Sequence, residues 1–119
     1  MGATKGDTAA GLDHYRADMN PDEAAFHKAM LRIYEVAKRE VGYNATRFLQ
    51  MLSEHGGVAT AKQLLHSPAV SDGFTALWMA GRDDLTVEAH VVKPEFAHLF
   101  TSEELAIAER RLDQYKSGP

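Results

Sequence analysis

The chain contains no cysteine among its 119 residues. This absence excludes disulfides, thiolate nucleophiles and cysteine-based zinc sites. No apolar run approaches the ~20 residues that a membrane-spanning helix needs, and the N-terminus lacks the apolar stretch of a signal peptide. We therefore expect a cytoplasmic protein.

Basic charge is also scarce. The chain has 13 Lys and Arg against 17 Asp and Glu, which gives a formal net charge of −4. Because nucleic-acid-binding domains usually carry a basic footprint, this balance argues against a general affinity for phosphate backbones. The sequence also lacks a phosphate-binding loop and a nucleophile elbow, since Gly56-Gly57 is followed by Val-Ala-Thr.

The pattern of apolar residues predicts an all-α fold, a compact bundle of five to six short helices. Residues 1–19 hold several glycines and no clean period, so we expect a flexible N-terminal arm followed by a single helical domain over residues 20–116. The predicted helices cover residues 21–41, 45–55, 59–66, 71–81 and 101–115. The predicted core comprises Phe26, Met30, Ile33, Phe48, Leu52, Leu64, Leu65, Leu77, Trp78, Leu85, Phe96, Leu99, Leu105 and Leu112.

Helix-capping residues set most of these boundaries. Asn20 precedes a proline and two acidic residues, which is typical of a helix start. Asn44 and Ser71 are the expected caps of two later helices, and Thr101 with Glu104 forms a capping box at the last one. Gly42 is the expected end of the first helix.

Residues 85–91 fit two patterns. Leu85, Val87, Ala89 and Val91 alternate with polar residues, which indicates a short strand. Leu85, Ala89 and Val92 also fit a helix, which Asp84 or Thr86 could cap. We favour the helix, because the sequence shows no second strand that could pair with this one.

Much of the chain resembles a helical domain found in many bacterial proteins without an assigned activity, some of which look like defence or nucleic-acid-processing systems. The resemblance covers roughly residues 30–115 and implies a bacterial, cytosolic, helical domain without implying a catalytic residue. Two positions depart from it, with Asp83 in place of a leucine and His90 in place of an aliphatic residue. The residues that carry it are Gly42-Tyr43, Phe48 to Leu52, Gly56-Gly57, Leu64-Leu65, Gly73-Phe74, Leu77, Arg82, Leu85 to Glu88, Phe96, Leu99-Phe100, Glu104 and Arg111-Leu112.

Six histidines raise the question of a metal site. Glu95 and His98 have the Glu-x-x-His spacing of di-metal helical bundles, but such sites need a second motif of this kind, which the sequence lacks. We therefore predict neither a metal site nor another cofactor.

The leading hypothesis is a non-enzymatic binding or adaptor module that recognises a protein partner or associates with itself. It follows from a compact core without a catalytic constellation or a basic face. Trp78 would be a good contact residue if exposed, although its spacing favours the core. Charged residues around it complete the expected partner-binding set, which consists of Trp78, Arg82, Asp84, Glu88 and His90.

Two alternatives remain open. Residues 45–66 have the layout of a helix-turn-helix, with Arg47, Thr60, Lys62, Gln63 and His66 as nucleic-acid contacts, although the cations are few. The other alternative is a small enzyme or ligand-binding domain centred on residues 82–90. The competing explanation for that segment is structural, with Asp84 as a cap and Arg82 paired to Asp83 or Glu88.

Overall fold

A computed structural model describes residues 20–116, and the fold in this range is all-α. Every regular element between these residues is helical, which confirms the predicted bundle, and residues 85–91 adopt no strand. The predicted arm, residues 1–19, lies outside the described residues. No helix in the described range combines the length and the apolar character that crossing a bilayer requires.

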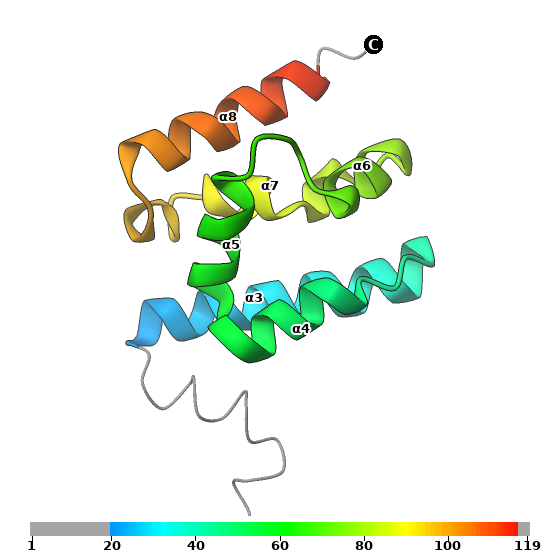
Figure 1. The fold of residues 1–119 in the computed structure, drawn as a ribbon, viewed down its shortest axis with the longest axis horizontal. Helices are drawn as coiled ribbons and strands as arrows, with labels where there is room; N and C mark the ends of the chain where they lie inside the picture. The colour runs from blue at the N-terminus through cyan, green and yellow to red at the C-terminus, as the bar shows by residue number, and fades with distance from the viewer. Residues whose placement is uncertain (1–19, 117–119) are drawn as a thin grey trace, which may run out of the picture.

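The helices form two layers joined by a crossing helix (Figure 1). Helices α3 and α4 lie side by side in one layer, α7 and α8 lie in the other, and α5 runs between the layers in contact with all four. Helix α6 lies at one end of the molecule (Figure 1). The elements are α3 (Pro21–Val36), the π-helix η1 (Ala37–Val41), α4 (Thr46–His55), α5 (Gly57–Leu65), α6 (Asp72–Met79), the 3-10 helix η2 (Asp83–Leu85), α7 (Val87–Val91), the 3-10 helix η3 (Ala97–Leu99) and α8 (Ser102–Lys116).

Most predicted caps are present. The Asn20 side chain accepts from the Glu23 amide at 2.8 Å, and the Glu23 carboxylate accepts from the Asn20 amide in return. Ser71 caps α6, and Thr86 caps α7 by accepting from the Ala89 amide at 3.1 Å. These bonds satisfy helix N–H groups that have no partner within the helix.

The predicted cap at Asn44 is wrong. The cap position of α4 is occupied by Ala45, and no side chain caps this helix. The Asn44 side chain instead accepts a hydrogen bond from the Tyr34 hydroxyl at 3.1 Å. The Asn44 side-chain oxygen that was expected to cap α4 is therefore hydrogen-bonded to Tyr34 of α3 instead.

Helices α3 and α5 cross at very close range. Helix α5 begins at Gly57, two residues earlier than predicted, and the Gly57 amide donates to Nδ1 of the buried His27 at 2.9 Å. A Cβ atom at Gly57 would lie 2.7 Å from the His27 Cα. Only glycine allows the two backbones to approach this closely.

The core lies where α5 meets both layers. Phe26 is fully buried and makes edge-to-face contacts with Phe96 at 5.1 Å and Phe100 at 5.3 Å between ring centroids. Three residues predicted in the core, Trp78, Leu85 and Leu112, are half-buried and lie outside the core cluster. Five others are half-buried and pack against it, namely Phe48, Leu64, Phe96, Leu99 and Leu105. The buried cluster comprises Phe26, Met30, Ile33, Leu52, Ala61, Leu65, Val87, Val91, Phe100 and Ala108.

Candidate functional site

A groove of about 620 Å3 lies between the start of α4, the loop over residues 66–71 and the start of α6. Its apolar lining includes the half-buried Tyr43, Phe48 and Leu64 and the buried Phe74. Cavities that bind ligands have volumes of about 300–1,000 Å3 and largely apolar walls with a few polar groups. We refer to this cavity as the groove, and it matches that description.

A buried ion pair lies at the groove, and one of its members, Glu88, lines it. Glu88 of α7 is 3% exposed, and its carboxylate accepts from Nη1 of Arg111 in α8 at 3.1 Å. Burial raises the pKa of Glu88, while the Arg111 guanidinium acts in the opposite direction. Glu88 lines the groove and its charge is balanced by Arg111, so the pair presents little net charge there.

The exposed rim of the groove carries one charge of each sign. Arg47, from the first turn of α4, and Asp72, from the first turn of α6, both line the groove and are exposed. Backbone and hydroxyl groups of the loop over residues 66–71 contribute further polar atoms. The groove therefore has an apolar interior and a rim without a dominant charge.

Arg82 forms a surface network with two carboxylates. Its guanidinium donates to Asp84 at 3.1 and 3.3 Å and to Glu40 of η1 at 2.6 Å. Hydrogen bonds from Arg82 lower the pKa of Asp84 and of Glu40. The predicted partners of Arg82, Asp83 and Glu88, are thus corrected to Asp84 and Glu40.

His90 is held by the backbone of its own helix. Its Nδ1 lies 2.8 Å from the Thr86 carbonyl oxygen, so Nδ1 carries the proton of this bond. Burial lowers the pKa of His90, which keeps the imidazole neutral at pH 7. The Glu88 carboxylate is hydrogen-bonded to Arg111, whereas the His90 imidazole is hydrogen-bonded to the Thr86 carbonyl.

The residues predicted around 82–90 therefore divide into separate groups. Arg82 and Asp84 belong to the surface network with Glu40, whereas Glu88 lines the groove. His90 is bonded to the backbone of its own helix, so Glu88 is the member of the predicted set that lines the groove.

Trp78 is neither fully buried nor fully exposed. Its Nε1 donates to the Tyr115 carbonyl at 2.8 Å, and the two rings meet edge to face at 5.4 Å. Tyr115 also contacts Phe74 edge to face at 5.0 Å. Trp78 thus joins α6 to the end of α8, which indicates a structural role.

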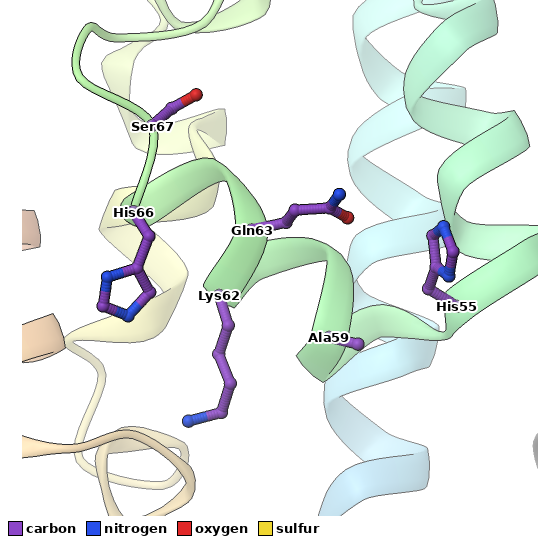
Figure 2. A pocket seen from close by; sticks show the side chains of 6 residues that line it. All are labelled: His55, Ala59, Lys62, Gln63, His66 and Ser67. Atoms are coloured by element: carbon purple, nitrogen blue, oxygen red, sulfur yellow. The ribbon is translucent and has the colours of Figure 1, made fainter.

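The outer face of α5 has a shallow hollow, lined by His55, Ala59, Lys62, Gln63, His66 and Ser67 (Figure 2). Lys62 and His66 project from the same side of the helix, while Gln63 points towards α4 (Figure 2). Lys62 and His66 both contact Glu104 of α8. Lys62 Nζ lies 2.7 Å and His66 Nε2 lies 2.8 Å from its carboxylate oxygens.

Glu104 is the acidic centre of this cluster. Burial would raise the pKa of Glu104, but hydrogen bonds from Lys62, the Thr101 amide and His66 outweigh it and lower the pKa to about 2. Glu104 is therefore ionised at neutral pH and offsets the positive charge of Lys62. It also completes the predicted capping box, because the Thr101 hydroxyl accepts from the Glu104 amide at 3.1 Å.

The five predicted nucleic-acid contacts do not share one surface. Thr60 is fully buried, which corrects its assignment as a contact residue. Lys62 and His66 bind Glu104, whereas Arg47 lies on the rim of the groove. Gln63 is exposed and borders both the groove and the hollow.

Metal-ligating side chains are dispersed over the described part of the chain. Between residues 20 and 116, no three His, Asp or Glu side chains lie close enough together to hold a metal ion. The Glu95 and His98 motif contributes to a different contact, in which His98 Nε2 lies 2.9 Å from an Asp22 carboxylate oxygen.

Sequence reasoning missed the loop over residues 66–71, which lines the groove, and Arg111, which supports that loop from outside the groove. Arg111 is a charged residue of the last helix, yet it is only 8% exposed. Neither feature has a local signal, because both depend on how α8 packs against α5 and α7.

Comparisons of this chain with protein-family models, curated proteins and solved structures find no match.

Proposed function

We propose that this protein is a non-enzymatic binding module that holds an apolar segment of a protein partner in the groove. The observation that carries the proposal is the groove itself, with its volume of about 620 Å3 and its aromatic and aliphatic lining. Large apolar side chains that fill such pockets supply most of the affinity at protein interfaces.

The distribution of charge supports an apolar occupant. Glu88 is already paired with Arg111 at 3.1 Å, so the groove offers no unpaired charge from this pair to an ionic ligand. Arg47 and Asp72 on the rim have opposite signs, which suits the polar rim that surrounds the apolar centre of many interfaces. A phosphate group would find only one of these two rim residues favourable.

The alternative is nucleic-acid binding through the outer face of α5. The hollow with His55, Lys62 and His66 favours it, because these three side chains can carry positive charge. The pairing of Lys62 and His66 with Glu104 weakens it, since phosphate binding would have to compete with that carboxylate. We therefore rank nucleic-acid binding second. For the binding module we also propose a bacterial, cytoplasmic setting.

Site-specific crosslinking tests the proposal in cells. A photoreactive amino acid replaces Ala69, which lines the groove, or the control residue Ala59, which lines the hollow on α5. Both are exposed alanines, so neither change disturbs the core. We expect a defined protein to crosslink from position 69 and not from position 59.

Three other results contradict the proposal. Crosslinking from position 59 alone would move the binding site to the outer face of α5, and nuclease-sensitive products from that position would favour the nucleic-acid alternative. If positions 69 and 59 gave equal amounts of the same crosslinked protein, the contact would not be specific to the groove.

A further inference from the structure

Arg111 connects α8 to several parts of the groove at once. Its Nη1 donates to Glu88 and to the Leu64 carbonyl at 3.2 Å, and its Nη2 donates to the Leu65 carbonyl at 3.4 Å and the Ser67 carbonyl at 2.7 Å. Leu64, Ser67 and Glu88 all line the groove. One side chain from outside the groove thus contacts three of its lining residues.

The chemistry of arginine explains why one residue can do this. A guanidinium presents several N–H donors in a fixed planar fork, whereas a lysine ammonium is a single point charge at the end of a flexible stem. The carbonyls of Leu64 and Leu65 lie in the last turn of α5, where the helix itself offers them few donors. The Leu64 carbonyl accepts from the Ser67 amide at 3.3 Å, and Arg111 adds a side-chain donor to both carbonyls. Arg111 therefore caps α5 with a side chain from another helix and continues into the loop through Ser67.

We infer that Arg111 is the positioning residue that fixes the loop over residues 66–71 as a wall of the groove. This inference rests on the proposed function, because it specifies what gives that site its shape. The bond to the Ser67 carbonyl, the shortest of the four, fixes the first part of the loop. The Ser71 hydroxyl, which caps α6, fixes its end. Without Arg111 the start of the loop would keep only the longer bond from the Ser67 amide to the Leu64 carbonyl, at 3.3 Å.

The test measures backbone order parameters of Ala69 and Val70 by 15N relaxation in the full chain. Arg111→Lys and Arg111→Met are the test variants, and Arg110→Met is the matched control because Arg110 is the exposed neighbour on α8. In both Arg111 variants we expect the order parameters at Ala69 and Val70 to fall from about 0.85 to below about 0.6, while amides of α3 stay near 0.85. Arg110→Met should change neither segment.

A second variant separates the ion pair from the loop contacts. Glu88→Gln keeps all three carbonyl acceptors of Arg111, so Ala69 and Val70 should remain ordered. If Arg111→Met does not fold, Arg111→Lys and Glu88→Gln decide the question. Unchanged order at Ala69 and Val70 in Arg111→Lys, or an equal loss of order in α3, would overturn the inference.

Affinity for the crosslinked partner separates this inference from the proposed function. Disorder of the loop together with at least tenfold weaker binding supports both. Disorder of the loop with affinity unchanged within about twofold supports the positioning role and contradicts the groove as the binding site.

Discussion

The crossing of α3 and α5 gives the sharpest test of the fold, through the substitution Gly57→Ala. The added Cβ would lie 2.7 Å from the His27 Cα, 3.2 Å from its N and 3.3 Å from its Cβ. Carbon atoms in contact normally stay about 3.5–4.0 Å apart, so one helix must move by nearly an ångström relative to the other. That movement would also stretch the bond from the Gly57 amide to His27 Nδ1.

The expected loss of unfolding free energy is about 2 kcal/mol. Overpacking in a well-packed interior costs about 1–3 kcal/mol, and a weakened buried hydrogen bond adds about 1 kcal/mol. The higher helix propensity of alanine returns at most about 1 kcal/mol. Equilibrium urea unfolding followed by circular dichroism measures the difference.

Gly73→Ala is the matched control for this substitution. Gly73 lies in the first turn of α6, and its nearest neighbours would be 3.7 Å from an added Cβ, which is ordinary contact. We expect this variant to be neutral or stabilised by up to about 1 kcal/mol. If Gly57→Ala were as stable as Gly73→Ala, the close crossing of α3 and α5 would be wrong.

Three further predictions concern the polar and aromatic contacts. Trp78→Ala should lower the unfolding free energy by about 2–3 kcal/mol, because it removes a half-buried ring, an aromatic contact and the hydrogen bond to the Tyr115 carbonyl. A loss below about 1 kcal/mol in a urea titration would contradict this structural role. The pKa of Glu104 is about 2 when folded and about 4.3 when unfolded, so its stabilising effect is complete above about pH 5 and is lost as pH falls towards 2. The stability difference between wild type and Glu104→Gln, measured by urea titrations from pH 6 to pH 2.5, should therefore shrink at low pH, and a constant difference would refute this. Arg111→Met should lower the unfolding free energy by about 3–5 kcal/mol, because it leaves the Glu88 charge buried without a partner. Adding Glu88→Leu should restore much of that loss, as measured by chemical denaturation. If the effects of the two substitutions simply added, the two residues would not be a coupled pair.

Local sequence signals predicted most helix starts. The caps at Asn20, Ser71 and Thr101 involve residues only three positions apart, so their pattern is visible in the chain itself. The helix over residues 87–91 was favoured over a strand for a global reason, the lack of a pairing partner, and the structure confirms a helix there. Asn44 failed as a cap because its partner, Tyr34, lies ten residues away.

The candidate site was much less predictable. Glu88 was singled out from the sequence, but its partner Arg111 is 23 residues away and no local pattern joins the two. The groove forms where α4, α6 and the loop over residues 66–71 meet, and no spacing along the chain records that arrangement. The predicted contact Thr60 is buried because α5 crosses between the two layers and exposes only part of its surface.

The most direct test of the proposed function compares two arginine substitutions against the purified crosslinked partner. Ala69→Arg places a long charged side chain beside the groove, while Ala59→Arg places the same side chain in the hollow on the outer face of α5. We predict that Ala69→Arg raises the dissociation constant at least tenfold and that Ala59→Arg changes it by less than about twofold. Both variants should be as stable as wild type. The reverse order of effects would contradict binding in the groove and assign the interaction to the outer face of α5.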